Sequence, residues 1–200
     1  MKLILASGSP RRAEILRAAG FQFELCAPDI PEVRQPGELA AHYVQRLAEE
    51  KARAVARKIG SRDSGGIILA ADTTVVVDGT ILEKPADATE ARAMIERLSG
   101  RTHEIYTGVA LLQLPEGRMR VFTEVTSVDF APLTPEEISD YVASGESLDK
   151  AGAYAIQGRG GKFVKRIDGC YFNVMGLPLG RIYQELRGLD CGLNAKTGRA

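Results

Sequence analysis

The chain has 200 residues, and its 26 lysine and arginine side chains balance 26 aspartate and glutamate side chains. This balance gives no broad basic surface for nucleic acid or a membrane, although it permits a local basic pocket. No stretch is apolar for long enough to span a bilayer, and the run in MKLILASGSPRR is too short for a signal peptide. The three cysteines are too widely spaced to predict a disulfide framework or a zinc site, which fits a cytoplasmic protein: Cys26, Cys170 and Cys191.

The N-terminal segment predicts a strand at 3–6, followed by a helix that Pro10 begins and Gly20 ends. Two cations, Arg11 and Arg12, stand in the first turn of this helix. A helix N-terminus offers free backbone N–H groups and a partial positive charge. This turn is therefore typical of a phosphate-binding site.

The next segments predict the longest helix and the first buried strand. An irregular loop at 26–36 leads into a helix over 36–59, and a polar connection follows at 61–66. The segment IILAADTTVVV at 67–77 is apolar and β-branched with little alternation, which is typical of a buried strand.

The second half of the chain predicts a hairpin between helices. Asp87 and Glu90 resemble a capping box for a helix that ends near Gly100. Two strands at 103–114 and 118–130 then form a hairpin, which argues against an all-parallel sheet. The remaining elements are a helix, a strand and a helix, expected at 134–145, 162–167 and 178–186.

This mixture of helices and strands predicts an α/β fold with a mixed sheet and flanking helices. The sequence shows no internal repeat and no low-complexity segment. We expect one domain over 1–187 and a flexible tail over 188–200, because the tail lacks periodicity.

Three charged residues break local rules. Asp72 stands in an apolar strand, where a buried carboxylate needs a partner or a metal, unless Asp72 ends the strand and caps a turn. Lys51 stands on the apolar face of the long helix, either directed into a site or extended to solvent from the edge of that face. Lys84 taken alone is an ordinary loop lysine.

The glycine-rich segment DKAGAYAIQGRGG at 149–161 is a fourth unusual feature. Its small residues permit close backbone approach to a ligand, although a plain loop is the alternative. His103 near the start of a predicted strand is more readily structural than catalytic. The sequence contains no serine, histidine and acid set at a recognised spacing, so a serine hydrolase has little support.

Together the unusual residues suit a polyphosphate bound with a divalent metal. Cations neutralise phosphate oxygens, and carboxylates hold Mg²⁺ or Mn²⁺ and can activate water. The residues concerned are Arg11, Arg12, Lys51, Lys84, Glu32 and Asp72.

Six segments in chain order closely resemble the Maf family of nucleoside triphosphate pyrophosphatases, also described as septum-formation inhibitors. They are SGSPRR, LAEEKA at 47–52, AADTTVVVDG at 70–79, EKP at 83–85, LSGRTHEIYTGVAL at 98–111, and DKAGAYAIQG with NVMGLPL. The resemblance implies an ITPase-like, Maf/Ham1-like fold with two lobes around a cleft. It also implies hydrolysis of a nucleoside triphosphate to the monophosphate and diphosphate with a divalent metal, and often a homodimer.

The resemblance assigns roles to particular residues. Asp72 corresponds to the catalytic aspartate, as a base or as a metal ligand, and Glu32 to a second metal ligand. The phosphate-binding positions are Ser7, Ser9, Arg12, Lys51 and Lys84. Two residues depart from the usual pattern, since Glu83 stands where glycine is common and Thr74 where valine is common.

Base selection in this family depends on a few further residues, here Arg11, Thr73 and Gln157. A glutamine amide offers both a donor and an acceptor and so matches the edge of thymine or uracil. The resemblance therefore implies a preference for dTTP and UTP in a house-cleaning role. The alternatives are a 7-methyl-GTP or purine-type pyrophosphatase, and a non-catalytic nucleotide-binding regulator of cell division.

Overall fold

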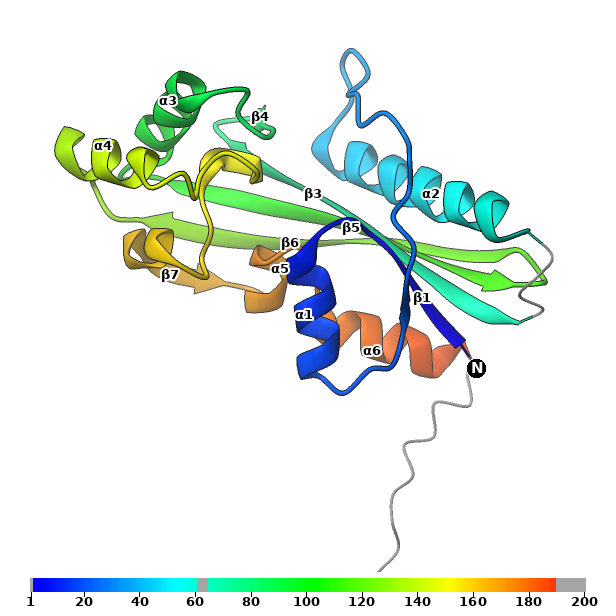
Figure 1. The fold of residues 1–200 in the computed structure, drawn as a ribbon. Coiled ribbons are helices and arrows are strands. Elements are labelled where there is room, and N and C mark those ends of the chain that lie inside the picture. Colours follow the sequence, from blue (N-terminus) through cyan, green and yellow to red (C-terminus); the bar gives the residue numbers. More distant parts are fainter. Residues whose placement is uncertain (1, 61–64, 190–200) are drawn as a thin grey trace, which may run out of the picture.

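The computed structural model describes residues 2–60 and 65–189 (Figure 1). The predicted tail lies almost wholly outside the described residues, as do Cys191 and most of the predicted 61–66 connection. Cys26 and Cys170 are free thiols. Within the described part of the chain, no helix combines the length and the apolar character needed to cross a membrane.

The helices and strands occur in the predicted general order, with several short elements added. They are β1 (Lys2–Ala6), α1 (Pro10–Ala18), β2 (Glu24–Leu25), α2 (Ala40–Ile59), β3 (Gly66–Val77), β4 (Thr80–Leu82), α3 (Ala88–Leu98), β5 (Thr102–Leu114), β6 (Arg118–Phe130), α4 (Pro135–Ala143), the 3₁₀ turns η2 (Ala151–Ala153) and η3 (Arg159–Phe163), β7 (Val164–Asp168), α5 (Tyr171–Val174) and α6 (Leu179–Gly188).

One mixed sheet runs through the molecule in the order β2-β1-β3-β5-β6-β7, and β4 also pairs with β3. β1 is parallel to β2 and β3, whereas the pairs β3–β4, β3–β5, β5–β6 and β6–β7 are antiparallel. The prediction of a mixed sheet with a central hairpin is therefore confirmed.

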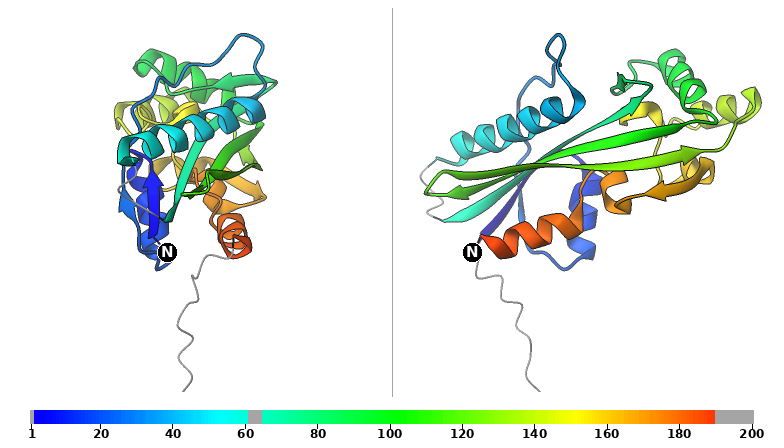
Figure 2. Two further views of the ribbon diagram at one scale, coloured as in Figure 1. Left: turned by 90° about the vertical axis from the view of Figure 1, so that its right-hand side faces the viewer. Right: turned by 180° about the vertical axis from the view of Figure 1, so that it is seen from behind.

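Two lobes share the long strands β3, β5 and β6 (Figures 1 and 2). In the first lobe, α2 covers one face of the sheet and α1 and α6 cover the other, with an apolar core on each face. In the second lobe, α3, α4, η2 and η3 pack on the far end of the strands around a separate core. Helices thus flank the sheet as predicted.

Gly108 of β5 lets α2 lie close against the sheet. A Cβ atom at this position would lie 2.3 Å from the backbone carbon and oxygen of Val44 in α2. Gly108 is also the β5 partner of Asp72 in the β3–β5 ladder. The absence of a side chain at Gly108 therefore brings α2 close to the part of β3 that carries the aspartate.

The predicted long helix begins later than expected, at Ala40 instead of residue 36. Gly37 has a φ of +73°, and the N–H of Glu38 bonds the carbonyl of Gln35, so a turn precedes the helix. Pro36 is part of this turn and not of the helix.

The helix cap predicted at Asp87 is present, and α4 begins with a second cap. The side chain of Asp87 accepts a hydrogen bond from the N–H of Glu90 at 2.9 Å. Thr134 and Glu137 form a complete capping box at the start of α4. Local polar spacing therefore located these helix starts correctly.

Candidate active site

The candidate site lies at an interruption in one edge of β3. On this edge β1 pairs with β3 as far as Ala70, and β4 begins to pair at Val75. The opposite edge pairs with β5 throughout this stretch. Residues 71–74 therefore have one open edge, from which Asp72 and Thr73 project to opposite faces because strand side chains alternate.

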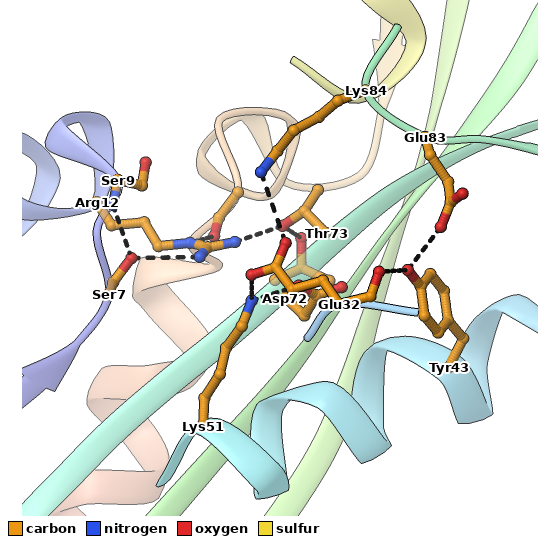
Figure 3. Close-up of polar contacts among 12 residues, drawn as sticks. Ser7, Ser9, Arg12, Glu32, Tyr43, Lys51, Asp72, Thr73, Glu83 and Lys84 are labelled. Atoms are coloured by element: carbon orange, nitrogen blue, oxygen red, sulfur yellow. Dashed lines mark hydrogen bonds and ion pairs between the residues drawn. The ribbon is translucent and has the colours of Figure 1, made fainter. Parts of the chain in front are cut away.

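Asp72 is buried and paired with a lysine of α2. Its Oδ1 lies 2.6 Å from Nζ of Lys51, and the two residues are only 6% and 4% exposed. The same Nζ lies 2.6 Å from Oε1 of Glu32, so one ammonium group bridges two carboxylates (Figure 3). Because β3 continues to Val77, the alternative in which Asp72 ends the strand is wrong, and Lys51 is directed into the site.

Burial and ion pairing act in opposite directions on these carboxyl groups. Burial raises the pKa of Asp72 above its ordinary value, although the charges of Lys51 and Arg12 oppose the shift. Burial also acts to raise the pKa of Glu32, but its bond to Lys51, together with the charge of Lys84, holds that pKa below the ordinary value. The site thus holds two carboxyl groups of different basicity, as acid–base sites often do.

Arg12 is held by three hydrogen bonds, one from each guanidinium nitrogen. Nε donates to the carbonyl of Gly176 at 2.8 Å, and the terminal nitrogens donate to Oγ of Ser7 at 3.3 Å and Oγ1 of Thr73 at 3.0 Å. The N–H of Ser9 also donates to Oγ of Ser7, at 3.1 Å (Figure 3). Ser9 occupies the N-cap position of α1 without a side-chain capping bond.

Lys84 faces these groups from the second lobe, directly after β4. Its Nζ lies 3.5 Å from Oε2 of Glu32, and its side chain is 63% exposed. Beside it, the Glu83 carboxylate accepts a hydrogen bond from the hydroxyl of Tyr43 in α2. The cations of the site therefore come from α1, α2 and the segment after β4.

A cavity of about 810 Å³ connects these groups. It brings together all the residues predicted on the phosphate and metal side, and two of the three predicted to select the base: Ser7, Ser9, Arg11, Arg12, Glu32, Lys51, Asp72, Thr73 and Lys84. Gln157, the third residue predicted to select the base, is exposed and lies outside the cavity lining.

Tyr43 and residues 174–176 of the NVMGLPL segment also line the cavity, although the sequence predicted no role for them. Tyr43 lies on the apolar face of α2 and is packed with Val44 and Leu47, so its position resembles that of a core residue. Its phenolic hydroxyl is the signal that could have distinguished it, because a buried hydroxyl needs a polar partner.

The glycines of 149–161 pack against protein groups, which favours the plain-loop alternative for them. A Cβ at Gly152 would lie 2.8 Å from the side chain of Val75, and one at Gly158 would lie 2.5 Å from a carboxylate oxygen of Glu146. Residues 149–151 and Tyr154 of this segment line the cavity instead.

His103 belongs to the core of the second lobe and not to the cavity lining. It is 1% exposed, its Nε2 lies 2.8 Å from the hydroxyl of Tyr154, and its ring packs edge-on against Phe130. Burial lowers the pKa of His103 to about 4. This position agrees with a structural role.

The carboxylates of Glu32 and Asp72 fit a divalent cation that completes its shell elsewhere. Among the described residues, no three histidine, cysteine, aspartate or glutamate side chains cluster into a metal site. Mg²⁺ commonly binds one or two carboxylates and takes its other ligands from water and substrate phosphates. Lys51, which now bridges both carboxylates, shows that the pair can hold a positive charge.

The family described as "Maf-like protein" matches residues 2–189. The chain belongs to the Maf family. A Maf relative from Carboxydothermus hydrogenoformans is 52% identical over 94% of this chain and 98% of its own length, and one from Syntrophomonas wolfei is 49% identical over 91% and 94%. Both relatives carry the name dTTP/UTP pyrophosphatase.

Two solved structures are also similar to this Maf chain. A nucleoside-triphosphatase / dITP/XTP pyrophosphatase from Mycobacterium abscessus covers 97% of this chain and all of its own, at 16% identity and a TM-score of 0.41. The Ham1 protein of Staphylococcus aureus covers 94% of this chain and all of its own, at 13% identity and a TM-score of 0.47.

Proposed function

We propose that the protein hydrolyses nucleoside triphosphates to the monophosphate and diphosphate, with a preference for dTTP and UTP. The observation that carries the proposal is Asp72, a buried carboxylate at the open edge of β3, in a cavity that also contains the cations Arg12, Lys51 and Lys84. This combination suits a bound triphosphate and an attacking water. The names of relatives at about 50% identity support the same activity.

In the proposed reaction, water attacks the α-phosphorus and the bond from this phosphorus to the diphosphate oxygen breaks. Asp72 accepts the proton of the water, and its raised pKa makes it a better acceptor than an exposed aspartate. Arg12 and Lys84 neutralise charge on the triphosphate, and Ser7 adds a hydrogen bond. Positioning and charge neutralisation supply most of the acceleration in phosphoryl chemistry.

We further propose that a divalent cation, Mg²⁺ or Mn²⁺, binds at Glu32 and Asp72. When bound, this cation supplies positive charge to the phosphate oxygens. Lys51 would then keep its place beside the carboxylates or turn toward a phosphate. Its burial on α2 restricts it to this small region of the site.

Base selection is proposed for Arg11, Thr73 and Gln157. Arg11 and Thr73 line the cavity, and Gln157 follows the cavity-lining Tyr154 by three residues. The amide of Gln157 can match the acceptor and donor edge of a pyrimidine, whereas an ionised glutamate would only accept hydrogen bonds. The homodimer and the cytoplasmic location stay predictions.

Incubation of the purified protein with a panel of triphosphates and Mg²⁺ or Mn²⁺ tests the proposed activity. We expect the highest kcat/KM for dTTP and UTP, with diphosphate released and not orthophosphate. Binding without turnover would favour the regulatory alternative. Fastest hydrolysis of 7-methyl-GTP or of a purine triphosphate would contradict the proposed base preference.

A further inference from the structure

Tyr43 and Glu83 make a direct contact across the cleft between the lobes. Tyr43 comes from α2 in the first lobe, and Glu83 follows β4 in the second lobe. The tyrosine hydroxyl donates a hydrogen bond of 2.6 Å to Oε1 of Glu83 (Figure 3). Both residues line the cavity, and Tyr43 is 4% exposed, so the bond lies beside the space for the substrate.

The same hydroxyl also contacts the loop that carries the second acidic residue of the site. It lies 3.4 Å from the backbone carbonyl of Glu32, a longer contact than the one to Glu83. One phenol group therefore contacts both Glu32 and the residue that precedes Lys84. Glu32 and Lys84 themselves face one another across the cleft, with Oε2 of Glu32 3.5 Å from Nζ of Lys84.

The backbone of Glu83 is held from its other side as well. Its carbonyl accepts a hydrogen bond of 3.1 Å from the N–H of Gly152, within η2. Lys84 by contrast is a long, mostly exposed side chain whose direction depends on the backbone that carries it. Fixing Glu83 at both its carbonyl and its carboxylate therefore limits where Lys84 can point.

A carboxylate in a triphosphate cavity would repel the substrate if it were free to turn toward the phosphates. The bond from Tyr43 engages one oxygen of Glu83 and directs the carboxylate toward α2. Burial, and next the Glu83 carboxylate itself, raise the pKa of Tyr43, so the phenol keeps its proton and stays a donor.

We propose that Tyr43 and Glu83 form a cross-cleft clasp that positions Glu32 and Lys84 for a metal-bound triphosphate. The proposal rests on the proposed function for the identity of the substrate. Both are positioning residues, because they act through Glu32 and Lys84. The clasp depends on the side chain of Glu83, because the phenol of Tyr43 bonds its carboxylate.

The first test is a double-mutant cycle with Tyr43→Phe, Glu83→Ala and the double variant, in steady-state hydrolysis of dTTP with Mg²⁺. Each single variant is expected to raise KM about tenfold, the effect of losing one hydrogen bond to a charged group, with little change in kcat. The double variant is expected to resemble the single ones, because one bond is lost in all three. Glu83→Gln keeps an acceptor for the phenol and is expected to restore most of the affinity.

Tyr106→Phe is the matched control. Tyr106 donates a 2.9 Å hydrogen bond to Glu104 and packs in the same apolar cluster as Tyr43, but it does not line the cavity. We expect wild-type kinetics for this variant. Glu83 is exposed, so its variants test the clasp even if a change at the buried Tyr43 impairs folding.

Calorimetric binding of inorganic tripolyphosphate with Mg²⁺ separates the clasp from the proposed function. If the wild-type protein hydrolyses no nucleotide, the proposed function fails, and weaker tripolyphosphate binding by Glu83→Ala still supports the clasp. The clasp is wrong if the variants bind and turn over like the wild type, or if the two single effects add. Tighter binding by Glu83→Ala would also overturn it, since Glu83 would then only repel the phosphates.

Discussion

Arg12 and Gly176 are 164 positions apart in the sequence, yet Nε of the arginine donates a 2.8 Å hydrogen bond to the carbonyl of the glycine. The segment after α5 therefore holds a side chain from the first turn of α1. Gly176 has a φ of +91°, and a Cβ there would lie 3.1 Å from Oγ1 of Thr73, another acceptor of Arg12. Glycine at this position keeps the guanidinium in place.

Arg12→Lys is expected to lower kcat/KM for dTTP by about ten- to a hundredfold. Lysine keeps the charge, but an ammonium cannot reproduce three bonds made by a planar guanidinium. Steady-state kinetics with dTTP and Mg²⁺ measures the effect. Arg17→Lys, in the last turn of the same helix, is the control and should behave like the wild type. Equal kinetics for Arg12→Lys and the control would show that the three hydrogen bonds of the Arg12 guanidinium do not contribute to catalysis or binding.

Asp72→Asn is expected to reduce kcat about 10²–10⁴-fold while the nucleotide still binds, because the amide cannot accept the proton of water. Single-turnover hydrolysis and calorimetric binding measure the two effects separately. Asp78→Asn, in the exposed turn after the same strand, is the control. Near-normal turnover by folded Asp72→Asn would remove Asp72 from the proposed chemistry.

Gln157→Glu is expected to lower the ratio of kcat/KM for dTTP to that for 7-methyl-GTP. The substitution replaces a side chain that both donates and accepts hydrogen bonds with one that only accepts them. The acceptor atoms of the thymine edge would then lack a donor, which lowers the discrimination between the two substrates. The two substrates are compared with both proteins under one set of conditions. An unchanged ratio would restrict base selection to Arg11 and Thr73, which line the cavity.

Gly108→Ala is expected to lower the free energy of unfolding by about 1–3 kcal/mol, because the added methyl group overpacks the contact between β5 and α2. It should also weaken dTTP binding, since α2 carries Lys51. Denaturant unfolding and calorimetry give the two values. Gly180→Ala on α6, where a Cβ meets nothing within 4 Å, is the control. A Gly108→Ala protein with the wild-type free energy of unfolding would show that α2 can move away from β5 without destabilising the fold.

His103 predicts a pH dependence of stability. Burial lowers its pKa from the ordinary 6.5 to about 4, so the folded state binds this proton less readily than the unfolded state. The contribution of neutral, buried His103 to the free energy of unfolding is fully present above pH 6.5. It is lost as the pH falls toward 4, and the loss is on the order of 3 kcal/mol.

Denaturant unfolding of His103→Leu between pH 4 and 6.5 should show a shallower dependence on pH than the wild type. His42→Gln replaces the only other histidine of the sequence, which is exposed on α2, and should keep the wild-type slope. Equal slopes for the wild type and His103→Leu would assign the pH dependence to other groups.

The sequence predicted the sheet class, the main elements, and Arg12, Lys51 and Asp72 of the cavity, because each leaves a local mark. Asp72 is conspicuous in an apolar strand, and Arg12 stands at a helix start after a serine loop. The predicted start of α2 was wrong because a proline can either begin a helix or belong to a turn. Here Pro36 belongs to a turn, in which Gly37 has a positive φ.

Partners far apart in the chain could not be predicted in this way. The bond between Tyr43 and Glu83 depends on how α2 and the segment after β4 meet, and no local spacing encodes that meeting. Short elements such as α5 carry too few residues to show a period. The glycines near 158 resembled a ligand loop because a close approach to protein and a close approach to ligand require the same residue.

The open edge of β3 at 71–74 also bears on self-association. An unpaired strand edge is a template on which another chain can add a strand and begin aggregation. Here the unpaired stretch lies between β1 and β4 on the same edge, so an incoming strand would have to enter between them. It also carries Asp72, whose charged side chain is held on one face of the sheet by Lys51, and a charged side chain on an edge strand disfavours the addition of another strand. The interruption in β3 is thus too short, and too closely flanked by β1 and β4, to recruit a second polypeptide.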